Sequence, residues 1–378
     1  MPVLQKVVWP RGRRLIGGRG KKEGTTGFHL KRFSNGKEDE KMRNCLKLTV
    51  FFVLSLGLLA TTANNAASAP MELKVVSYAT KGYPSLVGLD YYADLVSKRS
   101  GGKLEIKWAG GPEVFSPRDL LEKCGQGLVD LVHCPFGYWA SVAPEFGYDG
   151  LPFDVSWEGL PKLVEASAVP ADKVLNKKGV KLLVASNYTV VQRLVTKKPV
   201  HNMEDLRGRV IRGYGLMPAK MLEALGASSV VLPSAELYTA LDRGTVDGAM
   251  YNLMSFMEYK LHEIGVRYVV DNPLTYGFAC GVVMNMGKYK KLSPDLQKVL
   301  LEAGRETDLW AIEYWRKEDA KAKKDAQGKG VTFYNLTADE ADRWKTKLVA
   351  DLTPIFLGLK GADPQILKEF IELTKKKW

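Results

Sequence analysis

The feature that most constrains the fold is a short pattern, Gly-x-Val-Asp, that occurs twice in equivalent surroundings. It stands at residues 127–130 and again at 244–247. Each copy lies between a helical pattern and an apolar strand. In both places this strand is the last element of a succession of strand, helix, strand, helix and strand. Strands that alternate with helices predict parallel sheets covered by helices. The repetition therefore predicts an α/β protein with two similar lobes.

The expected elements of each unit follow from apolar periodicity and from turn residues. For the first unit they are a strand at 73–78, a helix to about 99, a strand at 104–108 and a helix that opens at 116. For the second unit they are a strand at 209–212, a helix at 218–225, a strand at 229–232 and a helix at 235–243. Ser116, Pro117 and Asp119 match a capping box with proline in the first turn. A strand is expected at 280–285, a long helix from Ser293 and Pro294 to about residue 324, and further helices at 338–377.

The first 69 residues differ from the rest of the chain. A basic head runs into an apolar stretch at 48–60, and a run of small residues follows at 64–69. This layout is typical of a secretory signal peptide, and 13 apolar residues are too few for a helix that stays in a bilayer. We expect residues 1–69 to be a basic leader and cleaved signal peptide, with Met42 as an alternative start and the periplasm as the destination.

The net charge does not indicate a nucleic-acid-binding protein. Residues 1–69 hold 13 Lys or Arg and 4 Asp or Glu, so they contribute +9 of the formal net charge of +13. The rest of the chain is close to +4 and has no basic stripe with interleaved aromatic residues. We therefore expect no nucleic-acid partner.

Signatures of catalysis and of cofactors are absent from the sequence. Three widely spaced cysteines follow the leader, an odd number that implies no disulfide framework. The histidines lack zinc-site spacing, and no Gly-x-Ser-x-Gly motif occurs. The loop at 213–215 lacks the third glycine of a dinucleotide loop, where Pro218 stands instead. We expect no cofactor, no metal and no enzymatic activity.

Candidate binding residues follow the strands of both units. Ligands of open α/β sheets bind beyond the carboxyl ends of the strands, because loops and helix N-termini meet there. Arg212 is the one cation at such a strand end, and a guanidinium can hold a carboxylate by two parallel hydrogen bonds. Asn252 offers a directional amide, and aromatic side chains can cover a ligand. The predicted contacts are Arg212, Asn252, Arg193, Tyr214, Tyr251, Tyr78, Tyr138 and Trp139.

The positions of these residues in the sequence are also compatible with structural roles. Arg212 is equally suited to a structural salt bridge inside the second unit. The aromatic residues fit a hydrophobic core as well as a cleft. Gln192 and Arg193 can each face either a cleft or solvent.

Three phrases in the second unit resemble the DctP-like solute-binding subunits of TRAP transporters. They run from Lys198 to Arg212, over residues 233–241 and over residues 244–248. Together the three phrases are a specific signal of this family, whereas each phrase alone would be a weak signal. The resemblance extends over essentially all of residues 71–378.

The resemblance implies a type II periplasmic-binding fold, in which crossing strands join two α/β lobes and a long helix braces both. Lobe one is expected at 70–189 plus 279–318, and lobe two at 190–278 plus 319–378. In that family the arginine at the position of Arg212 clamps the ligand carboxylate, and a polar residue corresponds to Asn252. A second cleft arginine falls at Gln192 or Arg193.

Departures from the family pattern bear on the ligand. Residues 135–139 lack the acidic residue that sialic-acid binders have there, so a sialic acid is not expected. Residues 213–215 replace a common Val-Pro and leave room for a bulkier acid. The sequence favours a keto, hydroxy or aromatic monocarboxylate.

The function expected from the resemblance is capture of a small organic acid and its delivery to the small and large membrane subunits of a TRAP permease. A ligand-binding partner of a membrane sensor is a second hypothesis, because the binding step is the same. A periplasmic enzyme acting on organic acids is a third, and it would need a nucleophile or a base in the cleft.

Overall fold

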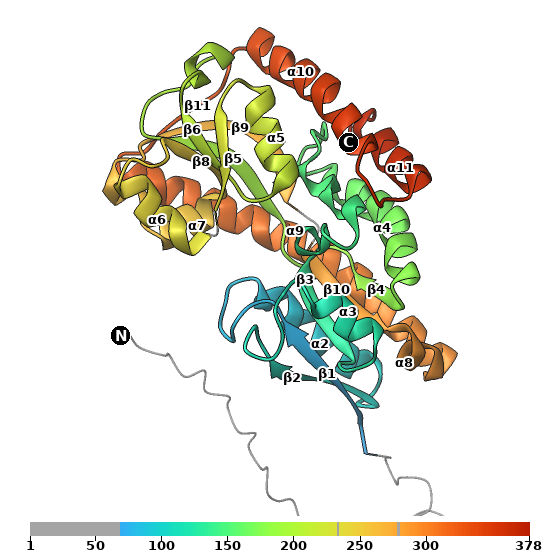
Figure 1. Cartoon of the computed structure of the whole chain (residues 1–378). Helices are drawn as coiled ribbons and strands as arrows, with labels where there is room; N and C mark the ends of the chain where they lie inside the picture. The colour runs from blue at the N-terminus through green and yellow to red at the C-terminus, as the bar shows by residue number, and fades with distance from the viewer. Residues whose placement is uncertain (1–68, 233, 278–279) are drawn as a thin grey trace, which may run out of the picture. The chain divides into compact units, whose positions relative to one another are not determined.

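The computed structural model describes residues 69–378 except 233 and 278–279 (Figure 1). The predicted leader, its alternative start at Met42 and its cleavage region lie outside the described residues. The described chain forms an α/β structure with two sheets, and the predicted fold class is confirmed.

The first sheet has the strand order β2-β1-β3-β10-β4. Strand β1 lies parallel to β2 and β3, whereas β10 runs antiparallel to β3 and β4. Its strands are β1 (Met71–Ser77), β2 (Leu104–Gly110), β3 (Leu131–Pro135), β4 (Val180–Val184) and β10 (Cys280–Asn285). The helices of this lobe are α2 (Leu86–Arg99), α3 (Leu120–Gly125), α4 (Leu160–Lys177) and α8 (Met286–Lys291). Two short 3₁₀ helices, η1 (Phe136–Trp139) and η2 (Pro144–Gly150), follow β3.

The second sheet has the order β11-β9-β5-β8-β6-β7. Strands β6, β7 and β8 are mutually parallel where they pair, and β5 runs antiparallel to β8 and β9. Its strands are β5 (Val190–Thr196), β6 (Val210–Gly213), β7 (Ser228–Val231), β8 (Gly248–Tyr251), β9 (Tyr268–Gly277) and β11 (Thr332–Tyr334). The helices are α5 (Leu216–Ala224), α6 (Ser234–Asp242) and α7 (Leu253–Glu258), with η3 (Met203–Leu206) and η4 (Leu261–Ile264).

The two Gly-x-Val-Asp copies occupy equivalent places and make the same hydrogen bond. Gly127 and Gly244 have positive φ angles of 79° and 71°, which end the preceding helix without strain. The Asp130 carboxylate accepts a 2.9 Å hydrogen bond from the Lys74 backbone N–H in the first strand of its unit. Asp247 accepts one of 2.8 Å from the Val210 backbone N–H in the corresponding strand. The aspartate therefore ties the start of the third strand to the first in both lobes.

Crossing strands and one long helix connect the lobes. The chain passes from β4 directly into β5, and from β9 into β10 through residues 278–279. Helix α9 (Pro294–Gly328) packs against α2, α4 and β4 of the first lobe and against β5 and α7 of the second. Figure 1 shows this helix running past both sheets. Helix α10 (Ala338–Leu357) packs on α5, and α11 (Pro364–Thr374) packs on α4 and α10.

The long helix begins as predicted, whereas the helix near residue 116 does not. The Ser293 hydroxyl accepts a hydrogen bond from the Leu296 N–H and caps α9. Helix α3 instead begins at Leu120, with no side-chain cap. The Pro117 carbonyl accepts from the Trp139 indole N–H at 3.0 Å, which holds residues 116–119 in a turn outside the helix.

Candidate functional site

Arg212 lies at the end of β6 and is 4% exposed. Its Nε donates to the Leu232 carbonyl at 2.8 Å, and Nη1 donates to the Met250 carbonyl at 3.3 Å. Burial lowers the pKa of this guanidinium, and the groups that act against burial are the phenols of Tyr251, Tyr214 and Tyr138. No carboxylate of the described chain forms an ion pair with Arg212. The result is a buried cation whose Nη2 has no hydrogen-bond acceptor among the described residues.

Two neighbours at the end of β8 complete the second-lobe side of the site. The Arg212 Cζ lies 5.5 Å from the centroid of the Tyr251 ring, within the range of a cation–π interaction. The Tyr251 hydroxyl is buried and makes no hydrogen bond of standard geometry; burial raises its pKa, although the nearby Ser234 hydroxyl and Arg212 lower it. Asn252 is 7% exposed, and its Oδ1 caps α7 by accepting from the Ser255 N–H at 2.9 Å. The Asn252 amide nitrogen has no hydrogen-bond partner among the described residues and can therefore donate to a ligand.

The first lobe contributes a tyrosine cluster. Ring centroids of Tyr78 and Tyr83 are 6.2 Å apart, and those of Tyr78 and Tyr138 are 6.1 Å apart. The Tyr78 hydroxyl donates to the Ser85 Oγ at 2.8 Å. Tyr138 is 47% exposed; burial of its hydroxyl raises the pKa, and the positive charge of Arg212 acts in the opposite direction. Tyr138 therefore lies within electrostatic range of Arg212 from the other lobe.

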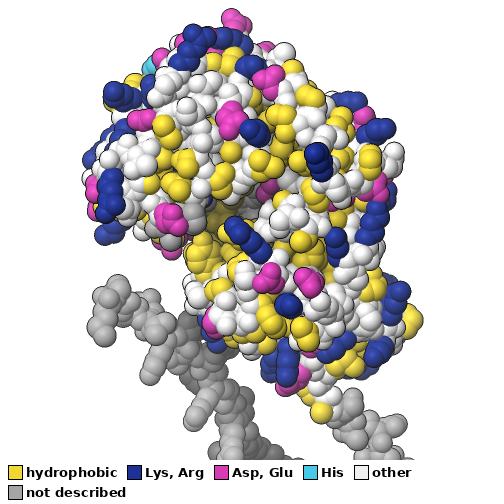
Figure 2. Space-filling model, viewed as in Figure 1, with side chains coloured by type: hydrophobic (Ala, Val, Ile, Leu, Met, Phe, Trp, Pro, Cys, Tyr) yellow, Lys and Arg dark blue, Asp and Glu magenta, His cyan; other side chains and the backbone are white. Residues whose placement is uncertain are grey.

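The surface between the lobes is hollowed, and hydrophobic side chains border the hollow (Figure 2). Tyr83 of the first lobe lies within electrostatic range of the second lobe. Burial raises the pKa of Tyr83, and the second-lobe residues Tyr259, Glu258 and Tyr251 raise it further.

Tyr214 interacts electrostatically with both Asp149 and Arg212. The Tyr214 hydroxyl is buried and has no hydrogen-bond partner. Burial raises the pKa of Tyr214, the negative charge of Asp149 raises it further, and Arg212 lowers it. Burial raises the pKa of Asp149 itself to about 7. Asp149 was missed in the sequence; the signal available was an acidic residue inside an aromatic, glycine-rich loop that adjoins the predicted aromatic contacts.

Arg193 has an environment different from that of Arg212. It is 5% exposed, and both terminal nitrogens bond the Asp319 carboxylate of α9 at 2.7 and 2.8 Å. Its Nε bonds Asp271 of β9 at 3.0 Å. Two carboxylates thus balance its charge and tie β5 to α9 and β9. The structure favours a structural role for Arg193 over the ligand contact expected from the sequence.

Gln192, the neighbouring residue left open by the sequence, is 8% exposed. Its Oε1 is buried without a hydrogen-bond partner. A buried amide oxygen without a donor costs free energy that a ligand or a water can recover. Of the two neighbours, Gln192 is the one with an unsatisfied polar group.

Trp139 lies in the hydrophobic core, and the predicted ligand contact is not available to it. Its side chain is 0% exposed and stacks on Phe136 at a centroid distance of 5.5 Å. Its indole N–H is bound to the Pro117 carbonyl. Position after a strand did not separate this residue from Tyr138, because the short helix η1 turns one ring inward and the other outward.

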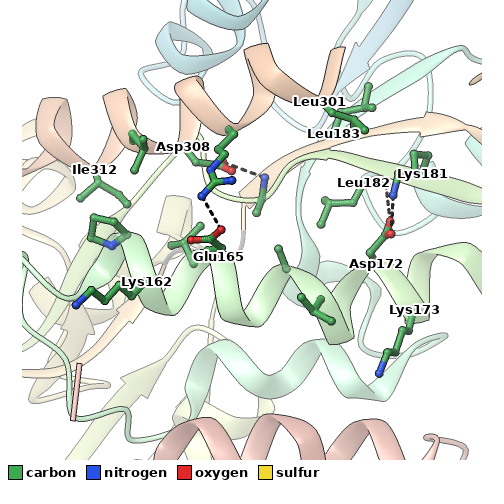
Figure 3. Close-up of a pocket in the computed structure, with 17 residues that line it drawn as sticks. Lys162, Glu165, Asp172, Lys173, Lys181, Leu182, Leu183, Leu301, Asp308 and Ile312 are labelled. Atoms are coloured by element: carbon green, nitrogen blue, oxygen red, sulfur yellow. Dashed lines mark hydrogen bonds and ion pairs between the residues drawn. The ribbon is translucent and has the colours of Figure 1, made fainter. Parts of the chain in front are cut away.

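A separate pocket lies between α4 and α9, above β4 (Figure 3). Its charged groups are largely satisfied by neighbours. Arg305 pairs with Glu165 at 2.6 Å, and Lys181 pairs with Asp172 at 2.6 Å. Asp308 accepts from the backbone N–H groups of Ala185 and Ser186. Asp308 has no cation partner in the described chain but is bound by these two N–H groups, and the pocket has no unpaired buried cation such as Arg212.

Comparison with protein families gives a match over residues 75–357 to DctP, the bacterial extracellular solute-binding protein, family 7. The chain belongs to this family. The resemblance found in the sequence is thereby confirmed.

Two related proteins each match most of this DctP-family chain. It is 26% identical over 262 residues to a solute-binding protein of Albidiferax ferrireducens, covering 67% of this chain and 76% of that protein. It is 23% identical over 292 residues to the C4-dicarboxylate-binding periplasmic protein DctP of Rhodobacter capsulatus, covering 75% and 86%.

Solved structures show the same fold. An extracytoplasmic solute receptor of Bordetella pertussis that binds pyroglutamic acid superimposes with a TM-score of 0.69 at 19% identity, covering 81% of this chain and 100% of that one. A TRAP periplasmic solute-binding protein from Rhodoferax ferrireducens with bound malonate gives 0.67 at 22% identity, covering 81% and 98%.

Within residues 69–378, apart from the three positions left out, no group of three or more His, Cys, Asp or Glu is arranged to hold a metal ion. None of the helices in that part of the chain is both long and apolar enough to cross a membrane.

Proposed function

We propose that this DctP-family protein captures a small organic carboxylate between its two lobes, with Arg212 as the anion anchor. The observation that carries the proposal is the buried guanidinium of Arg212, which has two carbonyl partners but no carboxylate in the described chain. A charge removed from water without a counter-ion is costly, and a bound carboxylate would offset that cost with charge-assisted hydrogen bonds.

The surroundings support an anionic ligand of modest size. Tyr214, Tyr251 and Tyr138 supply hydroxyl groups and apolar ring surface around Arg212. Asn252 can add an amide donor. The Tyr78 ring packs near Tyr138, with the two ring centroids 6.1 Å apart. Relatives of the same fold bind pyroglutamic acid and malonate, which share a carboxylate.

The ligand class favoured is a keto, hydroxy or aromatic monocarboxylate. Aromatic rings line the first-lobe side, and a carboxylate needs only one cation. We further propose export by the N-terminal leader, residence in the periplasm and delivery of the acid to the small and large subunits of a TRAP permease. Family membership supports this, since the family is extracellular.

The first experiment is a thermal-shift screen of the mature protein against organic acids and sugar acids, followed by calorimetry. A ligand at 100 times its dissociation constant adds about 2.7 kcal/mol to the free energy of unfolding, which a melting curve detects. Failure of every carboxylate in the screen would overturn the proposal.

The second experiment removes the anchor. Truncating one partner of a buried charged pair costs about 2–5 kcal/mol, so Arg212→Ala should weaken binding of the best acid by more than about thirtyfold. Arg212→Lys keeps the charge without the paired donors and serves where the alanine variant fails to fold. The exposed Arg243, replaced by Ala, is the matched control and should bind as the wild type does. Equal affinity of wild type and both Arg212 variants would contradict the anchor role.

A further inference from the structure

Asp149 is a second charged group that interacts electrostatically with Tyr214, besides Arg212. The partly buried Asp149 carboxylate lies against η1, where a Cβ placed on Gly137 would be 3.5 Å from its Oδ2. Gly137 directly precedes Tyr138, which faces Arg212. No cation of the described chain pairs with Asp149, and the hydrogen bonds that stabilise its charge come from backbone N–H groups at residues 149 and 150.

The position of Asp149 is defined by close packing of η2. A Cβ on Gly150 would lie 2.7 Å from the Met217 Cβ and 2.8 Å from the Pro218 Cδ. The start of α5 therefore presses directly on η2. The Thr275 hydroxyl of β9 donates to the Asp149 carbonyl at 3.0 Å. These contacts fix the backbone at residues 149–150, and the Asp149 carboxylate interacts electrostatically with Tyr214.

Gln192 reaches the same region from β5. It is the cross-strand partner of Thr275, so the two side chains share one face of the sheet. A Cβ on Gly277, two residues further along β9, would lie 3.5 Å from the Gln192 Nε2. Gln192 Oε1 and Tyr214 Oη are both buried and both lack a partner, whereas most buried polar atoms are hydrogen-bonded.

We propose that Asp149, Gln192 and Tyr214 form a second pole of the cleft that recognises a hydrogen-bond donor, a hydroxyl or N–H group, on the part of the ligand away from the carboxylate held by Arg212. The inference rests on the proposed function and narrows its ligand class. Asp149 and Gln192 present acceptor oxygens, and the Gln192 Oε1 and the Tyr214 hydroxyl have no hydrogen-bond partner among the described residues. A hydroxy acid or a lactam acid satisfies them, and a simple hydrocarbon acid does not.

The same pole disfavours a second carboxylate. Above pH 7, where the Asp149 carboxyl is ionised, a dicarboxylate would bring its distal anion beside this carboxylate, and like charges at short range repel each other. The cation–carboxylate contact at Arg212 would be unchanged. Selectivity between monocarboxylates and dicarboxylates is thus assigned to Asp149, and affinity for any carboxylate to Arg212.

The test uses acids in matched pairs that differ in one donor. Pyroglutamate is paired with its lactone analogue, in which oxygen replaces the ring N–H, and 3-hydroxybutyrate is paired with butyrate; succinate represents dicarboxylates. Calorimetry on the full mature protein should give the donor-bearing member of at least one pair an affinity about tenfold higher than its mate or more. Succinate should bind more weakly than that member.

The variant Asp149→Ala should reduce the preference within the pair to about threefold or less, because only the donor-bearing acid loses a partner. Asp149→Asn, which keeps the shape, replaces it where the alanine variant does not fold. Asp242→Asn, an exposed acidic residue of α6, is the matched control. Arg212→Lys should weaken both members of the pair alike.

The outcomes separate the two proposals. If carboxylates bind through Arg212 but both members of each pair bind equally, the second pole is refuted and the anchor stands. If the preference exists but survives Asp149→Ala, the assignment to Asp149 is refuted. If none of the acids binds, both proposals fall together.

Discussion

Arg193 on β5 and Arg212 on β6 are both buried cations, on the two strands that flank β8, yet only Arg193 is neutralised by carboxylates of the described chain. Arg193 makes a paired contact with Asp319 and a further one with Asp271. Arg212 is held by two carbonyl oxygens and an aromatic face. A cation that is already paired gains little from a ligand, whereas an unpaired one gains most of the stabilisation that a carboxylate can give.

This difference predicts opposite effects of variants at the two arginines. Asp319→Asn removes the main counter-ion of Arg193 and leaves a buried charge, so the free energy of unfolding should fall by about 3 kcal/mol. Ligand affinity of the folded protein should change less than threefold, because no ligand contact is lost. Urea denaturation and calorimetry measure the two quantities.

Asp351→Asn is the matched control for that prediction. Asp351 pairs with Lys347 at 2.8 Å on the surface of α10, where the loss of an ion pair costs about 0.5 kcal/mol or less. A loss of binding on Asp319→Asn as large as that on Arg212→Ala would instead place Arg193 in the ligand site.

At the scale of elements, the close approach of α9 to β4 joins the long helix to the first sheet. A Cβ at Gly304 would lie 1.8 Å from the Leu183 carbonyl oxygen, far inside van der Waals contact. The absence of a side chain at Gly304 therefore allows the helix to lie directly on the strand. Because α9 also packs on β5 and α7, its position on β4 affects both lobes.

Gly304→Ala should lower the free energy of unfolding by about 1–3 kcal/mol, since the helix must shift away from β4. The usual gain of a Gly→Ala change within a helix, up to about 1 kcal/mol, is overridden by the clash. Gly328→Ala in the last turn of the same helix has no atom within 4 Å of the new Cβ and should be neutral or slightly stabilising. Similar stability of both variants in denaturant titrations would exclude the proposed close packing.

At the scale of the whole molecule, His133 connects three segments of the first lobe. Its Nδ1 lies 2.9 Å from the Ser77 Oγ of β1, and its Nε2 lies beside the Asn187 side chain and 3.6 Å from the Cys280 Sγ. Burial lowers the pKa of His133 to about 4, against a smaller opposite effect of Asn187. The imidazole is therefore neutral in the folded protein at neutral pH.

The sign of the resulting pH dependence follows from linkage. The unfolded chain protonates His133 near pH 6.5 and the folded chain only near pH 4, so stability is present above pH 6.5 and is lost as the pH falls towards 4. The loss is on the order of 2–3 kcal/mol. In His133→Asn this contribution should be missing, so the stability of the wild type relative to the variant should rise between about pH 4 and pH 6.5, while the exposed His201→Asn should keep the wild-type slope. Equal slopes in pH-dependent denaturation would refute the assignment.

Asp149 and Asp308 act in the opposite direction at higher pH. Burial raises the pKa of each carboxyl to about 7, above its value in the unfolded chain, so their contribution to stability is lost as the pH rises through 7. Between about pH 4 and 7 these two carboxyls oppose His133, so the effect of His133 is seen in the difference in stability between the wild type and His133→Asn.

The sequence by itself determined the parts that depend on neighbours along the chain. The paired Gly-x-Val-Asp patterns predicted two units, because a helix end and the next strand are encoded within a few residues. The Ser293 cap was predictable for the same reason. Arg212 stood at a strand end by pattern alone, and the family phrases that end on it supported its role as an anchor.

The tertiary structure decided which side chains face the cleft. Arg193 and Gln192 differ by one position, and the direction in which β5 turns decides that one pairs with α9 while the other is left unsatisfied. Trp139 and Tyr138 differ in the same way. Asp149 and Ser116 depended on contacts with segments distant in sequence, α5 and β9 for the first and Trp139 for the second. Such contacts arise from packing between elements, and no local pattern encodes them.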